Sequence, residues 1–226
     1  MTLSEFSRYL GDVSSMALIT GLVLGVLFYK KLDRLHKSIL VYMVLMLTID
    51  TACRIFEYYN HSNMIVLPIF SLVELLFFVY LYNKYLLKKE SKTIIAFGLL
   101  GMLYIVVEFF EYFIFGTLDI KQFQPYSKIV DNFIIIVMAL VFYYEKMNSF
   151  NETKWSNFKL NTAILIYFTI NAIVFLPFNF IINENIGVRF YIWTVNVVII
   201  LLFYSYLTIL IWKNSRRAIG ETLVER

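Results

Sequence analysis

Long apolar stretches alternate with short polar segments along the whole chain, and this pattern predicts seven helices. Each stretch has about 20 residues, the length that a helix rising about 1.5 Å per residue needs to cross roughly 30 Å of hydrocarbon. We therefore expect an all-α integral membrane protein in which residues 1–226 form a single seven-helix membrane domain. The expected transmembrane helices cover residues 11–29, 39–59, 64–87, 93–115, 127–146, 160–182 and 188–212.

The composition supports the same class of protein. Of the 226 residues, 60% are hydrophobic and only 16% are charged, and the mean hydropathy is +0.72. A soluble chain is usually about 45 to 50% apolar and about 25% charged, so one globular core could not keep this excess of apolar side chains from water. Because Cys53 is the only cysteine, a secreted disulfide framework is excluded.

Lys and Arg residues divide unequally between the two sets of loops, and this difference predicts the orientation. Fifteen lie on one side, and four, Arg8, Lys121, Lys128 and Arg189, lie on the other. Because cytoplasmic loops carry the excess of Lys and Arg, we expect the N-terminus outside and the C-terminus in the cytoplasm. We expect a multi-pass protein of the cytoplasmic (inner) membrane. The net charge of +4 then reflects topology, and no nucleic-acid partner is expected.

Two patterns concern the packing of the helices. Ala17, Gly21 and Gly25 follow one another at four-residue spacing, which permits another helix to approach closely, and we expect this contact inside the bundle. The segments TID and FEYYNHSN after residue 47 resemble TIN and FNFIINEN after residue 168. This echo is compatible with a three-plus-one-plus-three arrangement of the helices, although apolar sequences also produce such matches by chance.

Charged residues inside the expected helices are costly in a bilayer and therefore indicate function. Asp50, Arg54 and Glu57 are spaced four and three residues apart, which places the arginine between two carboxylates on one helix face. Further acidic residues lie in the third and fourth helices, at Glu74, Glu108 and Glu111.

With the expected topology, these polar residues gather in the outer half of the membrane, although they come from several helices. We expect them to line one pocket that opens to the outside. The surplus of carboxylates would suit a cation, an amine or a proton. The alternative is a purely structural cluster whose charges pair with one another. The predicted ligand-binding residues are Asp50, Arg54, Glu57, Glu74, Glu108, Glu111, Asn179, Arg189 and Asn196.

Several chemistries find no support in the sequence. The two histidines, His36 and His61, fall in different loops, so they build neither a zinc-protease motif nor a Ser/His pair. We predict no catalytic residues, no metal ligands and no cofactor. An enzyme that acts on membrane lipids is a third alternative, because carboxylates can serve as acids and bases.

The third helix around Glu74 and the segment YIWTVNVVIILLFYSYLTILIWK near the C-terminus resemble small uncharacterised seven-helix membrane proteins of Bacteroidetes, which are loosely associated with sensor histidine kinases. The resemblance covers most of the chain. It implies a sensing or signalling role through a partner protein such as a membrane histidine kinase.

Two functions compete on this evidence. The first is a membrane sensor or receptor-like module that binds a small cationic or amine ligand and signals through a partner, with Pro177 kinking the sixth helix. The second is a small cation- or proton-coupled solute transporter. A transporter needs a polar path to the inner side, and the inner halves of the helices are predicted to be largely apolar and aromatic.

Overall fold

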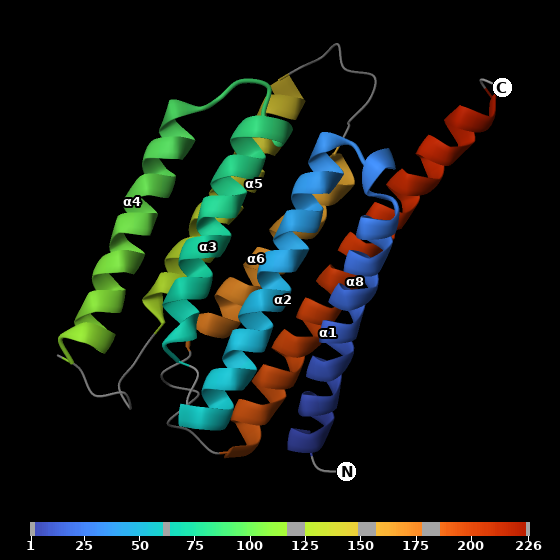
Figure 1. Cartoon of the computed structure of the whole chain (residues 1–226). Helices are drawn as coiled ribbons and strands as arrows, with labels where there is room; N and C mark the ends of the chain where they lie inside the picture. Colours follow the sequence, from blue (N-terminus) through green and yellow to red (C-terminus); the bar gives the residue numbers. More distant parts are fainter. Residues whose placement is uncertain (1–2, 61–63, 117–124, 149–156, 178–185, 225–226) are drawn as a thin grey trace. The chain divides into compact units, whose positions relative to one another are not determined.

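The computed structural model describes residues 3–60, 64–116, 125–148, 157–177 and 186–224, and their regular structure is helical (Figure 1). Two of the long helices, α3 and α4, end in a short π-helical segment. The helices are α1 (Leu3–Leu27), η1 (Tyr29–Lys31), α2 (Arg34–Asn60), α3 (Val66–Leu81), η2 (Tyr82–Leu86), α4 (Lys92–Phe109), η3 (Phe110–Ile114), α5 (Tyr126–Asn148), α6 (Phe158–Phe175) and α8 (Ile186–Val224).

Seven helices in the described part of the chain are long and apolar enough to cross a membrane, which confirms the predicted number. They are the helices expected of a multi-pass membrane protein. The candidate spans are Glu5–Leu27, Arg34–Tyr59, Val66–Leu86, Lys92–Ile114, Tyr126–Asn148, Phe158–Phe175 and Tyr191–Arg216.

The prediction of a proline kink inside the sixth helix is wrong. Helix α6 ends at Phe175, and Pro177 follows it in a turn. Proline is disfavoured inside a helix because it lacks an N–H and its ring clashes with the preceding turn. Pro177 therefore marks the end of α6.

Asp33 immediately precedes α2 and also contacts α8. Its Oδ1 accepts a hydrogen bond from the His36 backbone N–H (2.8 Å), and the Asn214 side chain donates to its Oδ2 (3.1 Å). Burial alone would raise the pKa of Asp33, but these bonds and the nearby His36 ring outweigh burial, so the pKa is lowered from its ordinary value of 3.8. The carboxylate thus acts as a helix N-cap.

The helices fall into two compact units, which we describe separately. The first unit contains Met1–Ile55 and Phe190–Arg226, and the second contains Phe56–Arg189. Helix α3 thus belongs to the same unit as α4, α5 and α6, a grouping that differs from the division suggested by the sequence echo. The first unit is built from α1, most of α2 and α8.

Close helix contacts in the first unit depend on the small residues of α1. A Cβ atom on Gly21 would meet the side chains of Met43 and Thr208, and one on Gly25 would meet Leu40. The Thr208 hydroxyl also donates to the Ala17 carbonyl (3.0 Å). The prediction that these small residues pack inside the bundle is confirmed.

The second unit packs α3, α4, α5 and α6 around a core of large apolar side chains. Helix α5 packs against α3, α4 and α6, and α3 also packs against α4. In the core, the rings of Phe78 and Phe168 meet edge to face, with centroids 4.9 Å apart. Polar groups occupy both ends of this core.

Candidate functional site

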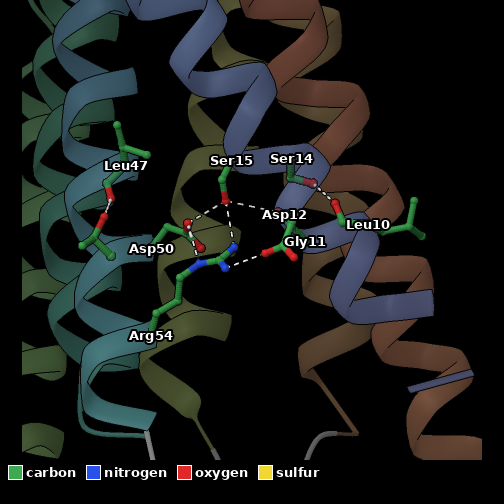
Figure 2. A network of polar contacts seen from close by, with 9 residues as sticks. Leu10, Gly11, Asp12, Ser14, Ser15, Leu47, Asp50 and Arg54 are labelled. Carbon is green, nitrogen blue, oxygen red and sulfur yellow. Dashed lines mark hydrogen bonds and ion pairs between the residues drawn. The ribbon is translucent and has the colours of Figure 1, made fainter. Parts of the chain in front are cut away.

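A network of charged and polar side chains joins α1 to α2 in the first unit (Figure 2). Arg54 donates through Nη1 to Asp12 Oδ1 (2.6 Å), through Nε to Asp50 Oδ2 (3.2 Å) and through Nη2 to Ser15 Oγ (2.9 Å). Ser15 in turn donates to Asp50 Oδ2 (2.7 Å). We call Asp12, Ser15, Asp50 and Arg54 the arginine network.

Helical spacing explains how the sequence builds the arginine network. Asp50 and Arg54 are four residues apart on α2, and Asp12 and Ser15 are three apart on α1, so each pair lies on one helix face. The pairing of Arg54 with Asp50 is the one that spacing predicts. The second carboxylate on the guanidinium is Asp12, whereas the expected partner Glu57 is exposed and is not among the groups that bind Arg54.

The arginine network is partly exposed although it lies within the candidate membrane spans. The exposed fractions are 48% for the side chain of Arg54, 46% for Asp12 and 36% for Asp50. Two carboxylates and one guanidinium leave a net charge of about −1. Because a charge facing hydrocarbon is costly, water or a polar group must cover the open side of the network.

A second set of charges is fully buried in the second unit. Lys128, in the first turn of α5, binds Glu74 of α3 and also donates to Asp131 Oδ2 (2.7 Å). The ammonium lies 4.2 Å from the centre of the Phe70 ring. We call Glu74, Lys128 and Asp131 the lysine cluster; it links α3 to α5.

The position of Lys128 differs from the one predicted from the sequence. Lys128 is 1% exposed and lies in the interior between the helices, whereas the loop assignment above places it among the loop cations.

Glu108 of α4 belongs to neither of these sets of charges. It is 3% exposed, and neither carboxylate oxygen accepts a hydrogen bond of ordinary geometry from the described residues. The Ser127 hydroxyl, the Ser127 backbone N–H and the Tyr104 hydroxyl lie close enough to act as weak hydrogen-bond donors to this carboxylate. Glu111, one turn further along, is exposed.

A second polar layer lies at the opposite end of the second unit, where α3 and α5 end and α6 begins. Buried Tyr82 donates to Asn161 Oδ1 (2.7 Å), and Asn161 Nδ2 donates to the Ala139 carbonyl (3.1 Å). The sequence pattern does not predict this layer, because Asn161 stands at the edge of an expected span. Its side chain is 0% exposed.

The remaining predicted site residues are less fully described. Asn196 of α8 is buried, and its Oδ1 accepts no hydrogen bond from the described residues. Asn179 lies outside the described residues, and so does the side chain of Arg189. The residues of the expected pocket thus belong to two separately described units, and a single shared cavity stays a prediction.

The described residues contain no group of three or more His, Cys, Asp or Glu side chains that could hold a metal ion. Comparisons with protein-family models, with curated proteins and with solved structures find no match to this chain. The function must therefore be argued from the two polar sites themselves.

Proposed function

We propose that the chain is a membrane sensor or receptor-like module that binds a small cationic or amine ligand at the arginine network. The observation that carries this proposal is a partly exposed pair of carboxylates, fixed by one arginine, inside two membrane-spanning helices. If the ion pairs served only to hold the helices together, we would expect both carboxylates to be buried.

The geometry supports a cation better than an anion. Asp12 Oδ2 and Asp50 Oδ1 are the carboxylate oxygens that Arg54 leaves without a hydrogen bond from the described residues. An ammonium group has only donors, so it can bind such acceptors directly. Arg54, whose donors are already engaged by Asp12, Asp50 and Ser15, orients the carboxylates and lowers the net charge that a ligand must neutralise.

The proposed topology places the arginine network near the outside. With the N-terminus outside and the C-terminus in the cytoplasm, the ends of α1 and α2 that carry the network face the exterior of the cytoplasmic (inner) membrane. A three-plus-one-plus-three relation between the helices belongs to the same proposal and rests on the sequence echo alone. Glu57, Glu74, Glu108, Glu111, Asn179, Arg189 and Asn196 remain proposed contributors to ligand binding.

Signalling in this proposal requires a partner protein. Helix α8 has 39 residues, or about 58 Å at 1.5 Å per residue, which exceeds the roughly 30 Å of a hydrocarbon core. Its C-terminal turns would therefore extend into the cytoplasm, where a partner such as a membrane histidine kinase could contact them. A ligand that binds one arrangement of α1 and α2 better than another would shift the population of these arrangements.

A thermal-unfolding assay on the purified full-length protein tests ligand binding. The probes are tetramethylammonium, a primary alkylamine and an alkali cation, each added alone. We expect at least one organic cation to raise the melting temperature of the wild type, because a ligand that binds only the folded state stabilises it.

The expected stabilisation should be lost in Asp12→Asn and kept in the control Glu90→Gln, which changes an exposed carboxylate between α3 and α4. Stabilisation that is equal in wild type and Asp12→Asn would contradict binding at the arginine network. So would the absence of any shift with all three probes.

The second candidate is a small cation- or proton-coupled transporter, and the second polar layer favours it. Glu74 and Tyr82, like Asp131 and Ala139, are eight residues apart, so the lysine cluster and Asn161 are separated by about 12 Å along the helices. The Phe78 and Phe168 rings lie in the core of the same unit. Ion flux through reconstituted liposomes that is lost in Glu74→Gln would make transport the better account.

A further inference from the structure

Glu108 presents a chemical problem that the arginine network and the lysine cluster do not explain. Its carboxyl group is buried inside a candidate membrane span. Its two oxygens accept no well-formed hydrogen bond from the described residues, and the groups close enough to donate to them are the Ser127 hydroxyl, the Ser127 backbone N–H and Tyr104, which are all neutral. The hydroxyl oxygen of Ser127 on α5 is buried and lacks a hydrogen bond in the same way. Buried polar atoms in this state require an explanation.

The charged groups on the neighbouring helices do not neutralise Glu108. Helices α3 and α5 pack against α4, and their buried charges in this region are Glu74, Lys128 and Asp131. Lys128 is engaged by Glu74 and Asp131, and it makes no ion pair with Glu108.

The other titratable groups near Glu108 offer no positive charge either. On its own helix these groups are Tyr104 and Glu111, and Tyr126 of α5 lies near Tyr104. The described surroundings of Glu108 therefore contain acids, phenols and a hydroxyl.

The local backbone is also unusual beside Glu108. Helix α4 changes to a π-helical turn at Phe110–Ile114, two residues after the carboxylate. Such wide turns are rare in proteins, and those that occur are often found at functional sites. The buried acid on α3, Glu74, by comparison, lies eight residues before the π-helical turn that begins at Tyr82.

We propose that Glu108 is a proton-binding site: the carboxyl group holds a proton in this state and releases it when water or a cation reaches α4. An ionised carboxylate without a cationic partner is far more costly in an apolar interior than a carboxylic acid. The acid can also donate its proton in a hydrogen bond to the Ser127 oxygen. This inference does not rest on cation binding at the arginine network, whose residues belong to the other unit.

Infrared spectroscopy of the full-length protein in lipid nanodiscs tests this inference. At neutral pH we expect the carbonyl stretching band of a protonated carboxylic acid. The band should disappear in Glu108→Gln and persist in the control Glu111→Gln, whose exposed carboxylate is one turn away. Labelling all glutamates with carbon-13 in the wild type should shift the band, which separates Glu108 from Asp131 without a mutation.

Two results would overturn the proposal. The first is a wild-type spectrum without a protonated-acid band at neutral pH. The second is a band that survives Glu108→Gln or does not move with glutamate labelling. If Glu108→Gln fails to fold, Glu108→Asp replaces it, and the glutamate-labelled band is then expected to vanish. Failure of the cation-binding assay at the arginine network would leave this measurement unaffected.

Discussion

Lys128 is the residue whose role follows most directly from its surroundings. It is completely enclosed, and it neutralises carboxylates of two different helices. Breaking a buried ion pair by removing one partner leaves an uncompensated charge, which typically costs about 3 to 5 kcal/mol.

We therefore predict that Lys128→Met lowers the free energy of unfolding by about 3 kcal/mol or more. Chemical denaturation in detergent micelles measures the loss. Lys159→Met on α6 is the matched control, because Lys159 is exposed and surface substitutions usually change stability by about 0.5 kcal/mol or less. Equal stability of the two variants would show that the lysine cluster contributes little to folding.

Asp33 gives a pH-dependent prediction outside the membrane spans. Its pKa is lower in the folded protein than the ordinary 3.8, so its contribution to stability is present above that ordinary value and is lost as the pH falls through the lower, folded value. Because the Asp33 side chain is 55% exposed, the contribution should be about 1 kcal/mol or less.

The test is the melting temperature of Asp33→Asn and wild type as a function of pH. The variant should be less stable at neutral pH, and the difference should shrink below about pH 4. A difference that grows on acidification would mean that the ionised carboxylate does not stabilise the cap of α2.

At the scale of the elements, α1 depends on its glycines to approach both α2 and α8. We predict that Gly21→Ala destabilises the protein by about 1 to 3 kcal/mol, as overpacking usually does, because the new methyl group would displace Met43 and Thr208. Gly11→Ala on the same helix has open space around its Cβ and should leave the thermal midpoint unchanged or higher. Similar losses in the two variants would rule out the close helix contact.

The elements themselves could be predicted because each apolar stretch is long enough to cross a bilayer, whereas the boundaries could not. Asp12, Lys128 and Asn161 all lie within two residues of the start of a predicted span. In the sequence, a polar residue at such a position cannot be distinguished from a loop residue. Only tertiary packing places Lys128 and Asn161 in the interior and brings Asp12 to Arg54. The π-helical turns have no recognisable sequence signal.

The candidate site was predictable in part for a similar reason. Spacing within one helix correctly pairs Arg54 with Asp50, because the distance between residues four apart on a helix is fixed. The contact of Arg54 with Asp12 joins residues 42 positions apart in the chain, and no local pattern specifies it. Spacing along the helix therefore predicted Glu57, an acid on the same helix face, as the second carboxylate partner of Arg54.

At the scale of the whole molecule, cation binding at the arginine network requires that water reaches these charged groups from outside, although they lie inside membrane spans. Thr51 lies on α2 within one turn of Arg54 and is exposed. Leu103 on α4 is 60% exposed and apolar, so it serves as a lipid-facing control.

The most direct test is labelling of Thr51→Cys, in a Cys53→Ser background, by a charged thiol reagent that cannot cross membranes. Applied to intact cells, the reagent should modify Thr51→Cys, which lies beside the arginine network, and should leave Leu103→Cys unmodified, because we expect its apolar surroundings to face lipid. A Thr51→Cys variant that stays unmodified, or that reacts only when the reagent is admitted to the cytoplasm, would contradict an outward-facing cation site.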